Sequence, residues 1–193
     1  MKKALFLSFL CAVAMAYLLA CGTGSQGSGA SATISNDSLV KKGKYLVNNM
    51  GCNDCHSPKV MTRMGPVPDT SKLLSGHPAG MPLAKIDTTV AKQWILFSPM
   101  LTSAVGPWGV SFSANLTPDE SGIGNWTEEQ FSRAIKEGKF KGMENGRNLL
   151  PPMPRFTQVK DEDVKAIFAY LKSIKPVDNV VPAAIPPMGL ARK

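Results

Sequence analysis

Residues 38–50 form the first of three stretches in which apolar residues recur at helical spacing. Leu39, Leu46 and Met50 fall near one face, and Ser38 stands where an N-cap would bind the first turn. Gly43 lies on the same stretch. A glycine permits another helix to cross closely, although it also occurs incidentally in ordinary amphipathic helices. We expect an amphipathic helix here and keep both interpretations of Gly43.

Residues 126–137 form the second predicted helix. Thr127 and Gln130 have the spacing of a capping box, and Gly138 provides a stop. The buried stripe consists of three apolar residues: Phe131, Ala134 and Ile135. These features predict a short helix with a defined beginning and end.

Residues 161–174 form the third predicted helix, with Asp161 as the expected N-cap and Pro176 as the terminator. Its apolar face consists of Val164, Ile167, Phe168 and Leu171. The chain beyond Pro176 is rich in proline. We expect residues 183–193 to be a tail that lies extended on the surface.

The N-terminus has the features of an export signal. An uncharged run over residues 4–20 follows Met-Lys-Lys, and it ends in Leu-Leu-Ala-Cys at residues 18–21. This ending resembles a bacterial lipobox, which implies a lipoprotein signal peptide over residues 1–20 and a lipid on the sulfur of Cys21. The chain is then expected to be anchored to a bacterial membrane and to face the periplasm. An uncleaved anchor and cleavage after Ala16 are the alternatives.

Residues 21–37 are rich in Gly, Ser, Ala and Thr and contain too few apolar side chains to form a core. We expect a flexible tether here, followed by a folded domain over residues 38–182. Cys11 leaves with the signal and Cys21 takes the lipid, so two cysteines remain as a pair. A structural disulfide framework is therefore not expected.

That pair belongs to a C-x-x-C-H motif formed by Cys52, Cys55 and His56, the sequence that attaches c-type haem. Two thiols at this spacing reach the two vinyl groups of the porphyrin. The next residue, His56, is then held beneath the iron as its proximal ligand. We expect a short helix to carry the motif, and one motif predicts one covalent haem c.

Two other kinds of site use a C-x-x-C pair. A thioredoxin-like redox site would lie in a βαβ context, and no such pattern surrounds residues 52–56. A zinc site needs two further ligands, whereas His77 is the one other histidine and no cysteine remains. Haem attachment is therefore the favoured interpretation.

Met153 is the predicted second iron ligand. Prolines at positions 151, 152 and 154 restrict the backbone around it and prevent helix formation, so a stiff loop presents its thioether. Ligation by methionine and histidine raises the potential of a haem. His77 is a rival, although a lone histidine in a Gly/Pro loop is expected to be a polar loop residue. Met100 and Met143 are further rivals.

Residues 52–113 otherwise contain many prolines and glycines and few regular signals. A loop region of this length in a compact domain is expected to be functional or to wrap around something, and the haem edge is the candidate. With the helices above, this predicts an all-α domain of about four to five helices with long haem-wrapping loops.

Longer motifs in the chain resemble a family of bacterial exported cytochromes c. They include Asn-Leu-Thr-Pro-Asp at residues 115–119, Gly-Ile-Gly-Asn-Trp at residues 122–126 and Pro-Pro-Met-Pro at residues 151–154. The family includes the cytochrome subunits of membrane-bound alcohol and gluconate dehydrogenases, and the similarity extends over residues 41–182. This chain carries one haem motif where those subunits carry several haem domains.

The resemblance implies a class I cytochrome c fold, in which the first and last helices cross, and it supports Met153 as the distal ligand. In this class a Gly-Pro carbonyl holds the second ring nitrogen of the proximal histidine. The resemblance therefore assigns that role to Pro66, for which a simple turn is the alternative.

Five further residues are candidates for haem contacts. Trp108, Trp126 and Arg147 carry donors that could reach the haem propionates. Packing beside the porphyrin is the alternative for the two tryptophans, and a surface position is the alternative for Arg147. Ile123 and Leu150 are expected to pack on the haem face.

The charge of the chain narrows its partners. The formal charge is +8, and loss of Lys2 and Lys3 with the signal leaves 20 basic and 14 acidic residues. This moderately basic balance suits an anionic partner or a membrane surface. No nucleic-acid partner is expected, because the basic residues are scattered and no nucleic-acid-binding motif accompanies them.

The predicted function is single-electron transfer by one haem with histidine and methionine ligands, and a dehydrogenase or a terminal oxidase as the redox partner. The chain is not expected to be an enzyme, because filled axial positions keep substrates from the iron. A peroxidase-like haem enzyme would need an open iron site and a distal acid–base group, for which His77 is the one candidate by residue type. A haem-based ligand sensor would need a displaceable Met153.

Overall fold

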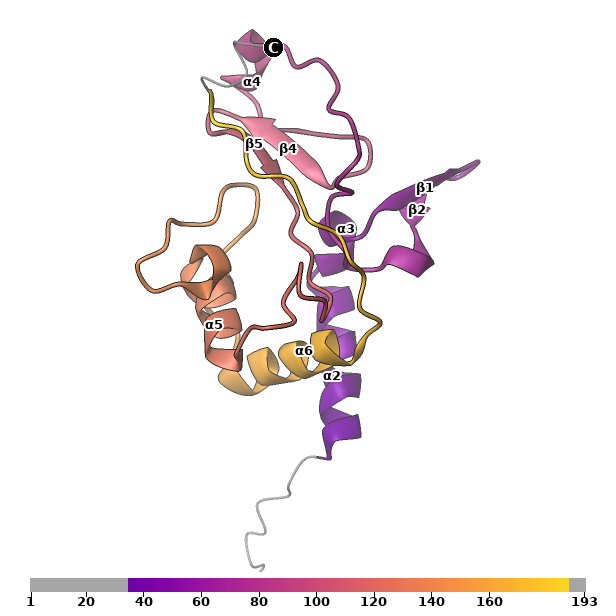
Figure 1. Ribbon diagram of the computed structural model, residues 1–193, viewed down its shortest axis with the longest axis vertical. Coiled ribbons are helices and arrows are strands. Elements are labelled where there is room, and N and C mark those ends of the chain that lie inside the picture. The colour runs from indigo at the N-terminus through magenta and orange to yellow at the C-terminus, as the bar shows by residue number, and fades with distance from the viewer. Residues whose placement is uncertain (1–34, 188–193) are drawn as a thin grey trace, which may run out of the picture. The chain divides into compact units, whose positions relative to one another are not determined.

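The computed structural model describes residues 35–187, so the predicted signal peptide, the lipid site at Cys21 and most of the tether lie outside the described residues. Helices at both ends of this part of the chain enclose a middle region that contains the short strands (Figure 1). The α-helices are α2 (Asn36–Asn49), α3 (Cys52–His56), α4 (Thr88–Ala91), α5 (Glu128–Ser132) and α6 (Asp161–Ser173). The strands are β1 (Lys59–Thr62), β2 (Gly65–Pro68), β3 (Leu96–Phe97), β4 (Ser103–Gly106) and β5 (Gly109–Phe112). Single turns of 3₁₀-helix lie at Thr70–Lys72 and Phe140–Gly142.

The predicted crossing of the first and last long helices is confirmed, because α2 and α6 pack across one another (Figure 1). Gly43 of α2 lies at the crossing, where a Cβ atom would overlap the carbonyl oxygen of Ala166 in α6. The glycine therefore permits the close approach and is not incidental. The core at this crossing consists of Val47, Leu74, Ile123, Phe131, Ile135, Val164, Ile167 and Leu171.

Gly43→Ala is expected to destabilise the protein, although alanine in an ordinary helix interior is favoured over glycine by up to about 1 kcal/mol. The added Cβ would meet backbone and not a side chain that can move away, so α2 and α6 must separate. We expect a loss of about 3 kcal/mol in the free energy of unfolding, measured by urea titration. Gly80→Ala is the matched control, because a Cβ there meets nothing within 4 Å. Equal stability of the two variants would contradict the crossing.

The ends of the predicted helices are confirmed in part. The capping box of α5 is present, with Thr127 accepting from the Gln130 backbone and Gln130 accepting from the Thr127 backbone. The helix continues as a π-turn over Arg133–Glu137 and stops at Gly138 in the left-handed region (φ 71°).

Two of the predicted N-caps are wrong. The α2 helix begins two residues earlier than expected, and the hydroxyl of Ser35 caps it by accepting from the Ser38 backbone N–H at 3.2 Å. Asp161 lies inside the first turn of α6, and Lys160 occupies the cap position. The Asp161 carboxylate instead forms an ion pair with Lys136 at 2.5 Å, which joins α6 to the turn after α5.

The prediction of an all-α domain is wrong in the region that was expected to be loop. The β1 and β2 strands form a hairpin, and β3, β4 and β5 form an antiparallel sheet in that order. Strands of two to four residues, with β4 buried along its whole length, show no alternation of apolar and polar positions. The sequence pattern therefore contains no strand signal there.

The sheet has its own small core of Ala91, Val105 and Val110, covered by Leu83, Ile86, Phe112 and Ile185. Ile185 also pairs with Val110 through two backbone hydrogen bonds of 2.8 and 3.0 Å. The domain thus extends past residue 182, and the predicted tail at 183–193 begins as part of the fold. Within residues 35–187, the helices lack the combination of length and apolar character that a bilayer-spanning segment needs.

Candidate functional site

The predicted haem-attachment motif lies on α3, as expected from the sequence. Gly51 precedes the helix in the left-handed region (φ 73°), which turns the chain sharply after α2. The ammonium group of Lys59 closes the other end by donating to the carbonyls of Asn53, Asp54 and Ser57 at 3.2, 2.9 and 2.5 Å. Within this frame Cys52 and Cys55 are both free thiols at half-buried positions.

The His56 imidazole is buried and held by one hydrogen bond. Its Nδ1 lies 2.8 Å from the carbonyl oxygen of Ala114. Burial lowers the pKa of His56, with a smaller opposing effect from this hydrogen bond. A carbonyl oxygen can only accept, so Nδ1 carries the proton of the neutral ring and Nε2 keeps its lone pair. No hydrogen bond to Nε2 is found among residues 35–187, and this nitrogen is not one of the enclosed unpaired atoms, so it is available as a ligand.

The assignment of Pro66 as the acceptor for His56 is therefore wrong. Pro66 lies on β2, exposed in the hairpin that projects from the domain (Figure 1). The acceptor is the backbone of Ala114, 58 residues after the histidine. A backbone carbonyl has no signature in the sequence, because any residue type provides one. The nearest signal is the Asn-Leu-Thr-Pro-Asp motif, which begins at the next residue.

Asn115 holds the Ala114 carbonyl in place. The buried side chain accepts from the Thr117 backbone at 3.0 Å and donates to the Val177 carbonyl at 2.8 Å. This ties the segment after β5 to the chain that follows α6. A second connection comes from the loop before α4, where the backbone of Gly76 donates to the His56 carbonyl at 2.7 Å. His56 is thus fixed by three segments that are far apart in the sequence.

The two thiols do not have the properties of a redox pair. Burial raises the pKa of Cys52 to about 11, and it also raises the pKa of Cys55. A nucleophilic C-x-x-C site needs the opposite, a lowered thiol pKa that supplies thiolate near neutral pH. The sequence-based preference for haem attachment over thioredoxin-like chemistry therefore has a physical basis in the structure.

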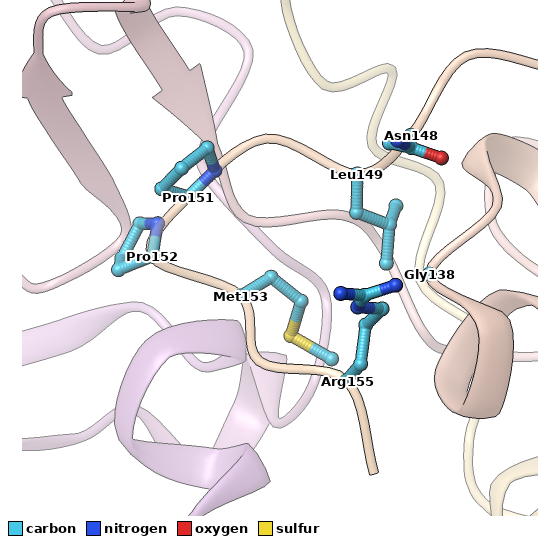
Figure 2. Close-up of a pocket in the computed structure, with 7 residues that line it drawn as sticks. All are labelled: Gly138, Asn148, Leu149, Pro151, Pro152, Met153 and Arg155. Atoms are coloured by element: carbon cyan, nitrogen blue, oxygen red, sulfur yellow. The ribbon is translucent and has the colours of Figure 1, made fainter. Parts of the chain in front are cut away.

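Met153 lies half-buried on the loop between the 3₁₀ turn and α6. It borders a cavity of about 260 Å³ that is also lined by Gly138, Asn148, Leu149, Pro151, Pro152 and Arg155. Figure 2 shows the Met153 thioether and the Leu149 side chain turned toward the same space as Arg155, with the two prolines at the far end of the loop. The loop therefore presents a sulfur atom to a cavity, while ligation of iron by Met153 stays a prediction.

Trp108 is connected to this loop through a hydrogen-bonded chain. Its indole N–H lies 3.3 Å from the hydroxyl of Ser111, which donates to the Pro151 carbonyl at 2.6 Å. The expected propionate donor thus has an internal partner, which links the sheet to the methionine loop.

Arg147, the second expected propionate donor, is exposed and also has partners within the domain. Its guanidinium lies 3.8 Å from the centre of the Phe140 ring and donates to the Asn148 carbonyl at 2.9 Å. This combination of a cation–π contact and a backbone hydrogen bond stiffens the loop before Met153.

The three remaining haem-contact candidates have different degrees of burial. Ile123 is fully buried in the core at the α2–α6 crossing, and Trp126 packs against the edge of that core. Leu150 is half-buried and lies three residues before Met153. Their contact with a porphyrin stays a prediction.

His77 lies in a loop, as the sequence indicated, but it is buried there and only 1% exposed. Its Nδ1 lies 2.9 Å from the Thr102 hydroxyl, and its ring packs on Phe112 with 4.7 Å between centroids. The Nε2 atom is enclosed and has no hydrogen-bond partner among the described residues. The sequence missed this burial because the covering residues come from β5 and from the segment before β4.

Because His77 is buried, we expect the protein to lose stability in acid. Burial lowers its pKa below 6.5, so the unfolded chain takes up a proton that the native protein does not bind. The stability is fully present above the unfolded pKa and is lost as the pH falls toward the lowered native pKa, by up to about 1.4 kcal/mol per pH unit. Urea unfolding at about pH 7.5 and about pH 5.5 measures this loss. The free energy of unfolding of His77→Asn should fall less between these two pH values than that of the parent protein. An equal fall would contradict the role of His77 in the acid sensitivity.

Two free thiols one helical turn apart, followed by an imidazole whose Nδ1 is fixed and whose Nε2 is available, fit a covalent haem-attachment domain. Comparison with known proteins agrees. The family model described as cytochrome c matches residues 40–175, and the chain belongs to the cytochrome c family. Its cofactor is covalently bound haem c.

Several relatives of the chain are named as cytochrome subunits. The gluconate 2-dehydrogenase cytochrome c subunit of Pantoea cypripedii is 32% identical over 74% of this chain and 25% of its own length. The alcohol dehydrogenase (quinone) cytochrome c subunit of Gluconobacter oxydans (strain 621H) is 28% identical over 74% of this chain and 23% of its own length. The fructose dehydrogenase cytochrome subunit of Gluconobacter japonicus is 42% identical over 39% of this chain. The chain spans a quarter or less of the length of these relatives.

Proposed function

We propose that this chain is a mono-haem, single-electron carrier whose iron is ligated by His56 and Met153. The observation that carries the proposal is the hydrogen bond from His56 Nδ1 to the Ala114 carbonyl at 2.8 Å. It fixes the tautomer and the ring orientation, and it leaves Nε2 as the ligand atom. A histidine held in this way is pre-organised for a metal, because its ring does not need to reorient on binding.

The Met153 assignment rests on the loop that carries it. The Ser111 hydroxyl anchors the loop at Pro151, and the stacking of Arg147 on Phe140 stiffens the chain before it. The thioether borders a cavity and is not packed away in the core. The rival Met143 is 49% exposed on the surface, which favours Met153 as the distal ligand.

The position of His77 argues against peroxidase-type enzyme chemistry. A haem enzyme of the peroxidase type needs a distal acid–base group, and His77 was the one candidate by residue type. His77 is enclosed between Thr102 and Phe112 instead. With both axial positions filled, the residues present support the transfer of electrons and not the conversion of a bound substrate.

The partner and the location follow from the relatives and from the N-terminal sequence. Relatives of the chain are named as subunits of gluconate, alcohol and fructose dehydrogenases, which favours a dehydrogenase as the electron donor, with a terminal oxidase as an alternative partner. The Leu-Leu-Ala-Cys sequence at residues 18–21 supports export and a lipid anchor at Cys21 that holds the domain on the periplasmic side of a membrane.

Three measurements on the exported, purified protein test this function. A pyridine haemochrome assay should give one c-type haem per chain. The oxidised protein should show the weak far-red absorption band of a methionine–ferric pair, and a redox titration should follow a single one-electron wave. A colourless protein, or an iron that binds added ligands without any substitution, would refute the proposal.

A further inference from the structure

The segment around β3 exposes an unusual run of apolar side chains. Trp94, Ile95, Leu96 and Phe97 are consecutive, and they are 64%, 50%, 38% and 44% exposed. Val90 and Leu101, on either side of this run, are 40% and 37% exposed. We call residues 90–101 the apolar edge. None of these six exposed residues is a candidate iron ligand or haem contact.

Both faces of β3 are partly open. Neighbouring side chains of an extended strand point to opposite faces, so Leu96 and Phe97, the two residues of β3, lie on opposite faces. Each is more than a third exposed, so the domain covers neither face of β3 completely. The backbone is also open on one side, because β3 lies at the end of its sheet and pairs with β4 alone.

This two-sided exposure favours an apolar medium over a second protein surface. A docked protein normally covers one face of a strand and leaves the other in water. Insertion into a lipid interface covers both faces together. Tryptophan is enriched at that interface because its ring is apolar and its N–H reaches the headgroups.

The charges beside the apolar edge match an anionic surface. Lys85 and Lys92 are exposed, and neither forms an ion pair among the described residues. Asp87 is the one acidic residue between them in the sequence, so residues 85–101 carry a net charge of +1. Each lysine near an anionic bilayer adds a favourable electrostatic contribution to binding.

From these observations we propose that Trp94–Phe97 inserts into the headgroup region of an anionic lipid bilayer, with Lys85 and Lys92 contacting the lipid phosphates. The segment would then be a second membrane contact, formed by the folded domain itself and independent of any lipid on Cys21. Two contacts restrict the orientation of a tethered domain, which a flexible tether alone does not.

The test uses holoprotein without its lipid. The leader is exchanged for a conventional cleavable one and Cys21 is replaced by serine, so every described residue is retained. Co-sedimentation is measured with sucrose-loaded vesicles of phosphatidylcholine alone and of phosphatidylcholine with phosphatidylglycerol. The protein should bind the anionic vesicles, and Trp94→Ser with Phe97→Ser should weaken binding by about tenfold or more. Lys85→Gln with Lys92→Gln should remove most of the preference for anionic vesicles.

A matched control is available in the β1–β2 hairpin, where Met61 and Met64 are 63% and 95% exposed. Met61→Ser with Met64→Ser removes a comparable apolar area from a different part of the surface, and it should leave vesicle binding unchanged. The haem spectrum and far-UV circular dichroism of each variant show that it is folded.

Three results would overturn the proposal. The first is absence of vesicle binding by the parent protein. The second is an equal loss of binding in the hairpin control, which would indicate general stickiness. The third is unchanged vesicle binding in Trp94→Ser with Phe97→Ser accompanied by slower reduction by a partner or by loss of a dimer, which would assign the apolar edge to a protein contact. None of these results bears on the haem ligands, so the proposed electron-carrier function is tested separately.

Discussion

Replacement of Cys52 and Cys55 by alanine is expected to abolish covalent haem attachment. The two thiols are the free cysteines of the described chain, and they lie on α3 next to the fixed imidazole of His56. Without them no thioether bond forms, so any retained porphyrin must be released by denaturation. Haem staining of a denaturing gel measures the change, and the signal should fall from one haem per chain to none.

The control for this experiment is Asp54→Asn. Asp54 is exposed on the same short helix, between the two cysteines, and its substitution leaves both thiols and His56 unchanged. The control should stain as strongly as the parent protein. Haem that remains bound to the double cysteine variant after denaturation would show that another residue forms the attachment.

Met153→Ala is expected to lower the reduction potential and to open the iron to small ligands. Loss of the thioether removes a ligand that favours the reduced state. Because the choice of axial ligands sets haem potentials over about 0.8 V, we expect a fall on the order of 0.1 V or more. A redox titration measures the potential, and binding of cyanide or imidazole to the oxidised protein measures the access to iron.

Met143→Ala serves as the control for the distal ligand. Met143 lies ten residues before Met153 in the sequence, ahead of the proline-flanked loop, and it is 49% exposed. Its removal should change neither the potential nor the far-red absorption band. If Met143→Ala produced these changes and Met153→Ala did not, the ligand assignment would be reversed, while covalent attachment at Cys52 and Cys55 would be unaffected.

The local features of the fold were predictable because they depend on residues close together in the sequence. The capping box of Thr127 and Gln130, the stop at Gly138 and the helix that carries the haem motif each involve interactions over five residues or fewer. The short strands were not predictable in this way. The β4 strand is buried throughout, and its pairing with β3 and β5 is what makes it a strand.

The burial of His77 and the acceptor for His56 were also beyond the reach of the sequence. A motif found in related proteins suggested Pro66, yet the hairpin that contains Pro66 projects away from the domain. The acceptor is a backbone atom of Ala114, and its position depends on the hydrogen bonds of Asn115 to residues about 60 positions away.

The sequence by itself determined the chemistry of this protein: two thiols and an imidazole at fixed spacing define a covalent haem site, whatever surrounds them. The tertiary structure alone decided which carbonyl orients His56, where the cavity beside Met153 lies and which apolar residues the fold leaves exposed. The physical reason is the sequence distance over which each interaction acts. Covalent spacing acts along a few residues of chain, whereas orientation, burial and exposure arise from segments that meet only after folding.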